Sequence, residues 1–162
     1  MINVHAETYG DYEYEINADG KTVTITKYMK EDEYDPETGW TIVDNNPLYI
    51  PASIEGRKVT IIGEESFKGI LGNSNIVIPN GVEQIGLSAF EGMYNLTSVS
   101  LPNTLKVIGQ TAFFDCMDLS VITLPDSLEE IGDNAFGYTN ISSVWILSLI
   151  HISEPTRPIS IS

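Results

Sequence analysis

The side chains that could do chemistry are mostly carboxylates in the C-terminal half of the chain. Paired carboxylates can serve as the acid and base of a glycosidase. The six candidates are Asp115, Asp118, Asp126, Glu129, Glu130 and Asp133. They fall at predicted turns and outer edges, where solubility explains them and no cleft is implied. General acid–base catalysis needs a sheltered group with a shifted pKa, so we expect no enzyme and no catalytic residue.

The chain has few cysteine and histidine side chains that could act as an activated nucleophile or bind a metal ion. The chain has one cysteine, Cys116, and two histidines, His5 and His151. One cysteine excludes an intramolecular disulfide and any multi-cysteine metal site. Neither histidine is well placed to activate a nucleophile. Cys116 stands where the preceding repeat has Met93, which favours a small buried side chain over a reactive thiol. We expect no metal and no cofactor.

The densest acidic run, residues 31–37 (EDEYDPE), raises the question of calcium, because hard cations prefer several carboxylate oxygens. Its spacing fits no EF-hand loop, however, and Pro36 with Thr38-Gly39 is ordinary turn chemistry. A solvated loop is the favoured interpretation, and a calcium site is the open alternative.

Composition narrows the classes of partner. Asp and Glu total 23 against 8 Lys and Arg, a formal net charge of −15. Nucleic-acid backbones and anionic membranes both attract clustered cations, so this balance argues against either partner. No apolar run approaches the roughly 20 residues that cross a bilayer. The length of 162 residues fits one domain, and the acidity is explained by solubility.

The element that must position these groups is an internal repeat. Glycine, phenylalanine and proline each recur at a constant interval of 23 residues. The positions are Gly63, Gly86, Gly109 and Gly132; Phe67, Phe90, Phe113 and Phe136; and Pro79, Pro102 and Pro125. Three residue types that keep one period are a highly specific signal.

Each repeat has a physical logic. Residues 96–101 (LTSVSL) end in the alternation of a half-buried strand, and proline then ends the strand because it has no N–H to donate. A second apolar pair, such as Leu105 and Ile108, leads to the glycine, where we expect a positive φ. The phenylalanines are expected to point inward and to stack along the axis. One unit cannot bury its own apolar face, so the repeats must stack.

The repeat resembles a known family. The segment IGQTAFFDCMDLSVITLPDSLEEIG, from Ile108 to Gly132, is similar nearly throughout to the BspA-like leucine-rich repeats of bacterial cell-surface proteins. The resemblance covers residues 49–146, about four units. It implies a β-rich solenoid, a right-handed stack of 23-residue repeats, in a secreted or surface-attached protein with an adhesin-like role. It carries over no catalytic residues.

Residues 8–48 do not follow the repeat pattern and are predicted to form a β capping segment that includes the acidic loop. Two alternating runs, residues 12–16 and 22–26, flank Asp19-Gly20, which predicts a β-hairpin. Such a hairpin is similar to the segment that often precedes these repeats. A cap is needed because the open end of a stack exposes unpaired strand edges.

The two ends are interpreted separately. Residues 1–7 are expected to be the remnant of an export leader, since Val4 and Ala6 suit a signal-peptidase site, or else a disordered start. Residues 147–162 resemble a translated sequencing-library adapter, and we interpret them as a non-native tail. A natural short tail is the alternative. On the first interpretation the chain is a fragment that ends within a repeat.

The outward side chains of the predicted strands form the candidate binding face. They are mostly small and polar, which suits a flat surface that packs against a protein or a glycan, and Trp145 is a candidate anchor. The face comprises Asn75, Val77, Ser98, Ser100, Val121, Thr123, Ser143 and Trp145. We predict a non-catalytic binding module for a protein or glycan ligand on host or neighbouring cells. The alternatives are merely soluble strand positions, and a spacer or stalk for domains missing from the fragment.

Overall fold

The computed structural model describes residues 6–30, 33–35, 40–42, 47–142 and 145–146, and within them the elements are strands joined by turns. The strands are β1 (Glu7–Tyr9), β2 (Tyr12–Ile16), β3 (Thr22–Tyr28), β4 (Glu33–Asp35), β5 (Trp40–Ile42), β6 (Leu48–Tyr49), β7 (Ser53–Ile54), β8 (Arg57–Ile62), β9 (Asn75–Val77), β10 (Gln84–Ile85), β11 (Ser98–Ser100), β12 (Val107–Ile108), β13 (Val121–Leu124), β14 (Glu130–Ile131) and β15 (Trp145–Ile146).

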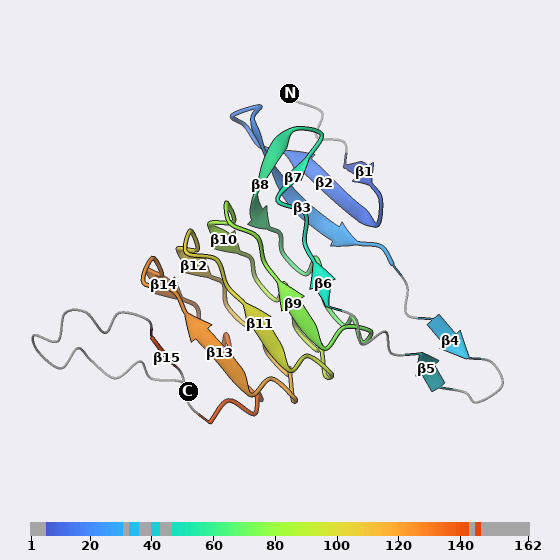
Figure 1. The fold of residues 1–162 in the computed structure, drawn as a ribbon, viewed down its shortest axis with the longest axis vertical. Coiled ribbons are helices and arrows are strands. Elements are labelled where there is room, and N and C mark those ends of the chain that lie inside the picture. Colours follow the sequence, from blue (N-terminus) through green and yellow to red (C-terminus); the bar gives the residue numbers. More distant parts are fainter. Residues whose placement is uncertain (1–5, 31–32, 36–39, 43–46, 143–144, 147–162) are drawn as a thin grey trace, which may run out of the picture.

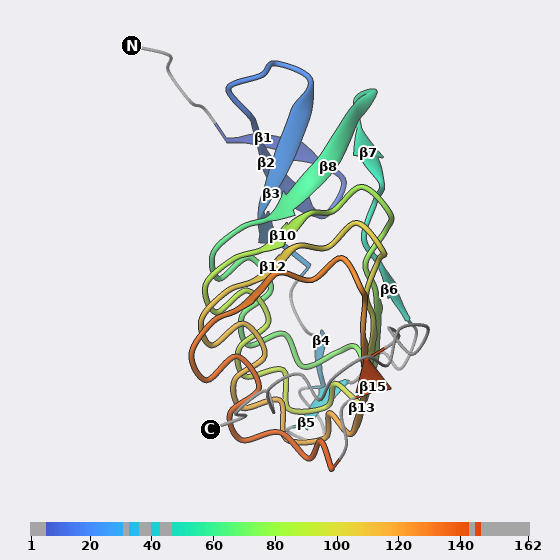
Figure 2. The same cartoon turned by 90° about the vertical axis from the view of Figure 1, so that its left-hand side faces the viewer.

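Two sheets run the length of the repeat region (Figure 1). In one, β6, β9, β11, β13 and β15 pair in parallel. In the other, β8, β10, β12 and β14 pair in parallel and continue the order β1-β2-β3. Figure 2 shows successive coils overlying one another, with β13 and β15 on one side and β10 and β12 on the other. A coil here means one pass of the chain through both sheets.

Equivalent positions of neighbouring coils pair with each other. Ile85 lies between Ile62 and Ile108 in the parallel register. The hydroxyls of Ser88 and Thr111, which are 23 residues apart, are hydrogen-bonded at 2.8 Å. The period in the sequence therefore corresponds to the contacts between one coil and the next, because each residue meets its counterpart.

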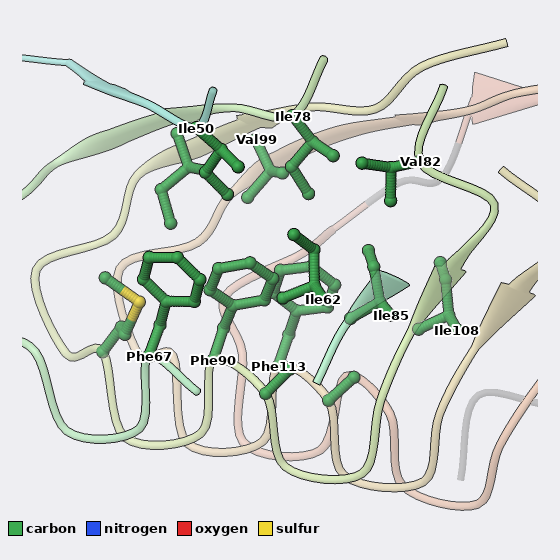
Figure 3. Close-up of a cluster of buried hydrophobic side chains, with 14 of the residues drawn as sticks. Ile50, Ile62, Phe67, Ile78, Val82, Ile85, Phe90, Val99, Ile108 and Phe113 are labelled. Atoms are coloured by element: carbon green, nitrogen blue, oxygen red, sulfur yellow. The ribbon is translucent and has the colours of Figure 1, made fainter. Parts of the chain in front are cut away.

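The phenylalanines form a continuous ladder through the core, as predicted. Phe67, Phe90, Phe113 and Phe136 stack with centroid separations of 5.1, 5.1 and 5.5 Å. All four rings are buried. Figure 3 shows three of them across the core from Ile78 and Val99. Stacked rings each bury a large apolar area, so this ladder is a major source of stability.

The predicted hairpin is present, and its second strand pairs with the first strand of the repeat sheet as a preceding coil would. β2 and β3 pair antiparallel, and β3 then pairs in parallel with β8. Tyr28, at the end of β3, stacks on Phe67 at 5.4 Å and so extends the ladder by one ring. Gly63 N donates to the Ile25 carbonyl at 2.7 Å, in the bond that each later coil makes to the one before. The hairpin thus covers the end of the stack with matching backbone and side chains.

The repeated glycines have a different cause from the one expected. The positive φ falls two residues later, on Glu65, Ser88, Thr111 and Asn134, at 52, 50, 51 and 53°. A Cβ on Gly63 would lie 2.6 Å from the Ile25 carbonyl oxygen, and one on Gly86 would lie 2.9 Å from Glu64 N. The prediction of positive φ was wrong. Glycine is required because adjacent coils approach too closely for a side chain.

The acidic run at residues 31–37 is only partly a loop. Glu33–Asp35 form β4, which pairs antiparallel with β5. The prediction of a loop was therefore wrong for these three residues, whose backbone is paired with a neighbouring strand. The other positions of the run lie outside the described residues, so the calcium site stays an untested alternative.

Candidate binding face

Strand alternation divides the side chains of β9, β11 and β13 between the core and the surface. Ile76, Val99 and Ile122 point inward and are 1, 6 and 1% exposed. The residues before them point outward. The register aligns these outward residues in one row across three strands, namely Asn75, Ser98 and Val121.

A second row runs beside the first. Val77 lies opposite Ser100 in the register of β9 and β11, and Thr123 lies opposite Trp145 in that of β13 and β15. The structure therefore brings seven of the eight predicted face residues onto one sheet, with Trp145 placed by its backbone pairing alone. The eighth, Ser143, lies outside the described residues.

One residue of this face was missed by the sequence analysis. Tyr49 in β6 pairs with Val77 and is 67% exposed, so a large aromatic side chain extends the second row. The signal was present, because residues 48–51 (LYIP) repeat the strand-then-proline pattern of residues 76–79 (IVIP). The interval from Pro51 to Pro79 is 28 residues rather than 23, and this longer interval hid the equivalence.

The face is uncharged and carries hydrogen-bonding groups. Ser98 Oγ donates to Asn75 Oδ1 at 2.5 Å, which ties neighbouring strands together at the surface. Val121, 59% exposed, adds an apolar contact surface. A shallow hollow of about 300 Å³ lies over β11 and β13, and its lining residues are Ser98, Val99, Ser100, Leu101, Thr123 and Pro125. Such a surface can accept and donate hydrogen bonds while it contacts a flat partner.

The six carboxylates considered for catalysis lie on turns, in connecting segments or in the short strand β14. All are exposed except Asp115, which is half-buried. Within the described ranges, His, Cys, Asp and Glu side chains form no group of three that could hold a metal ion. The described residues likewise include no helix long and apolar enough to cross a membrane.

Cys116 is a core residue, as interpreted from its place in the repeat. Its side chain is buried, and Sγ donates to the Phe90 carbonyl at 3.2 Å. Burial raises the pKa of the thiol to about 12. The thiolate, which is the reactive form, is therefore scarce near neutral pH.

Comparison with known proteins agrees with this architecture. A family model described as "BspA type Leucine rich repeat region" matches residues 50–155, in six copies. A leucine-rich repeat protein of Bacteroides capillosus is 31% identical, with a TM-score of 0.71, and the alignment covers 87% of this chain and 97% of that one. A search of curated proteins gave no match.

Two further solved structures share the fold. A Treponema leucine-rich repeat protein (T. pallidum) is 24% identical, with a TM-score of 0.62 and coverage of 86% of this chain and 71% of that one. A leucine-rich repeat protein of Bacteroides ovatus is 23% identical, with a TM-score of 0.67; 88% of this chain is covered but only 37% of that longer one. With its repeated glycines, phenylalanine ladder and parallel strands, the chain belongs to the BspA-type leucine-rich repeat family.

Proposed function

We propose that this chain is a non-catalytic binding module that contacts a protein or glycan through the sheet face of β6, β9, β11 and β13. The observation that carries the proposal is the in-register pair of rows on this face. Uncharged side chains line both rows, from Asn75 to Val121 and from Tyr49 to Ser100, and all but Tyr49 are small. Leucine-rich repeats of this family are generally protein-interaction modules rather than enzymes.

The chemistry of the face suits recognition. Hydroxyl and amide groups on neighbouring strands match the donors and acceptors of a sugar or a peptide backbone. Tyr49 offers an exposed aromatic ring of the kind that dominates binding energy at interfaces. Short side chains lose little rotamer entropy when they are buried by a partner.

The proposal includes the architecture and location that the family resemblance implies. In this proposal each coil is one 23-residue repeat, which is supported by hydrogen bonds between side chains 23 residues apart. The right-handed sense of the coils is taken from the family resemblance. The protein acts in an adhesin-like way, either secreted or attached to the bacterial surface. The family match to a repeat type of bacterial surface proteins supports this location.

The test adds charge and bulk to the face. The purified chain and its variants are applied to an array of immobilised glycans and host surface proteins. Ser100→Lys and Thr123→Lys place a lysine at exposed face positions, and we expect at least tenfold weaker binding. Asn103→Lys, at an exposed turn outside the face, is the matched control and should bind as the wild type does.

A spacer or stalk would behave differently in the same experiment. If the repeats only separate other domains, Ser100→Lys and Thr123→Lys will leave every interaction unchanged. Release of sugars or peptides from the arrayed ligands would contradict the non-catalytic part of the proposal. Equal loss of binding in Asn103→Lys would show that charge alone, rather than the face, determines the result.

A further inference from the structure

A second surface carries large apolar side chains in the loops that follow the phenylalanine ladder. We call it the loop patch, and it consists of Tyr94, Phe114, Met117 and Tyr138. Tyr94, Met117 and Tyr138 are 44, 54 and 74% exposed, and Phe114 is half-buried. Exposed apolar groups that cluster, rather than occurring singly, mark interaction sites on soluble proteins.

The C-terminal half of the loop patch is built by direct contact. The Tyr138 ring meets the Phe114 ring edge-on, at 5.1 Å and 89°. The Phe114 ring also lies across Gly137 of the next coil, where an added Cβ would come 2.8 Å from Phe114 Cδ2. Gly137 thus leaves the space that brings the two rings together.

Backbone hydrogen bonds join this half to the other. Gly92 N donates to the Phe114 carbonyl at 2.9 Å, and Asp118 N donates to the Tyr94 carbonyl at 3.2 Å. The Tyr94 hydroxyl lies 4.0 Å from the position of a Cβ on Gly92. The four side chains therefore come from three successive coils whose backbones are hydrogen-bonded to one another in these loops.

The backbone of Tyr138 adopts a conformation that is unfavourable for a residue with a side chain. Its φ is 54°, in the left-handed region, as is that of Asp115, its equivalent in the preceding coil, at 60°. The equivalents in the two coils before that, Gly69 and Gly92, are glycines with φ of 73°. An aromatic residue in this region costs on the order of 1 kcal/mol relative to glycine. The contact with Phe114 offsets part of this cost, but the side chain is still 74% exposed, so most of its surface is available to a partner.

The charge around the loop patch indicates what it would bind. Asp115 and Asp118 each directly follow a patch residue and form no ion pair with a described residue. Between residues 86 and 142, Lys106 is the one Lys or Arg, and it is paired with Glu83 at 2.7 Å. The carboxylates of the same stretch are Glu91, Asp115, Asp118, Asp126, Glu129, Glu130 and Asp133.

We propose that the loop patch is a docking site for a protein segment in which arginine or lysine alternates with apolar residues. Cationic side chains of such a segment would lie over the tyrosine rings and pair with Asp115 and Asp118. Its apolar side chains would pack against Phe114 and Met117. Tyrosine and methionine are enriched at protein interfaces, whereas a purely acidic surface would select by charge alone. This surface is separate from the sheet face, and neither proposal depends on the other.

The experiment uses the full chain and three labelled peptides, with binding followed by fluorescence anisotropy at physiological ionic strength. One peptide alternates Arg and Leu, the second replaces Leu by Ser, and the third replaces Arg by Glu. We expect the Arg-Leu peptide to bind at least tenfold more tightly than either of the others. Tyr138→Gly combined with Met117→Ser should reduce that affinity at least tenfold, and Asp118→Asn severalfold.

The controls separate this site from the sheet face and from misfolding. Val121→Ser removes an exposed apolar side chain from the sheet face and should bind the Arg-Leu peptide as the wild type does. Tyr138→Gly suits the observed φ, so its fold should be retained, with an unchanged unfolding midpoint or a higher one. No binding of the Arg-Leu peptide, equal binding of the Arg-Ser peptide, or equal loss in Val121→Ser would each overturn the proposal.

Discussion

Gly109 lies directly against the backbone of Gly86 in the preceding coil. A Cβ on Gly109 would come 2.6 Å from the Gly86 carbonyl carbon, a separation that real Cβ atoms essentially never show. Gly109 N donates to the Ile85 carbonyl at 2.8 Å, and this bond holds the two coils at that distance. The column of glycines is therefore an intercoil contact, and glycine recurs in it because each coil lies this close to the one before.

Gly109→Ala is expected to destabilise the protein by about 2 to 3 kcal/mol, as overpacking of a tight contact does. The measurement is the free energy of unfolding from urea denaturation. Gly92→Ala is the matched control, because its Cβ would meet its nearest neighbour only at 3.9 Å, and its φ of 73° alone should cost about 1 kcal/mol. Equal destabilisation by the two substitutions would contradict the contact explanation.

Tyr28→Ala should destabilise the chain by about 3 to 5 kcal/mol, the usual loss when a large buried aromatic side chain is removed. Tyr28 is 8% exposed and stacks on Phe67, so it couples the N-terminal hairpin to the repeats. Tyr9→Ala, which removes a 47% exposed tyrosine of β1, should change stability by no more than about 0.5 kcal/mol. Two separate unfolding transitions in the wild type would show that the hairpin is not coupled.

The repeat period was sufficient to predict the ladder, the buried strand residues and the strand positions of the face residues on β9, β11 and β13. A period identifies which residues are equivalent, and the alternation at Ser98, Val99 and Ser100 then separates outward from inward side chains. It does not report distance between coils, so the reason for Gly109 had to come from the structure. That is why a turn with positive φ was expected at a position of close approach.

Equivalences outside the period were not predictable in the same way. Tyr28 occupies a ladder position, but its strand belongs to a hairpin with a different sequence pattern. Tyr49 pairs with Val77 but lies 28 residues before it, five more than the period of 23. Tertiary pairing places both residues in the stack, and local patterning alone gives no indication of such pairing.

Cys116 should resist thiol reagents in the folded protein. Because burial raises its pKa to about 12, little thiolate forms at mildly alkaline pH, and the side chain is also inaccessible. We expect almost no reaction with a disulfide-exchange reagent over hours, and complete reaction in concentrated guanidinium. Cys116→Ser combined with Met117→Cys moves the thiol to a 54% exposed position and should react within minutes. A similar rate for the wild type would contradict the buried assignment.

Stability should fall as the pH rises from about 10 to about 12. Burial raises the pKa of Tyr12 to about 12, and the hydrogen bond from the Tyr14 hydroxyl to Glu7, at 2.6 Å, raises the pKa of Tyr14 together with burial. In the unfolded chain tyrosine loses its proton near pH 10, so above that pH the unfolded state binds fewer protons than the folded state. The stabilisation is therefore complete below about pH 10 and is lost as the pH approaches the folded-state values. The unfolding midpoint, measured at half-unit pH intervals, should decline over this window. Tyr14→Phe should start less stable and decline less steeply, because one titrating group is gone, whereas an equally steep decline would exclude Tyr14 as a contributor.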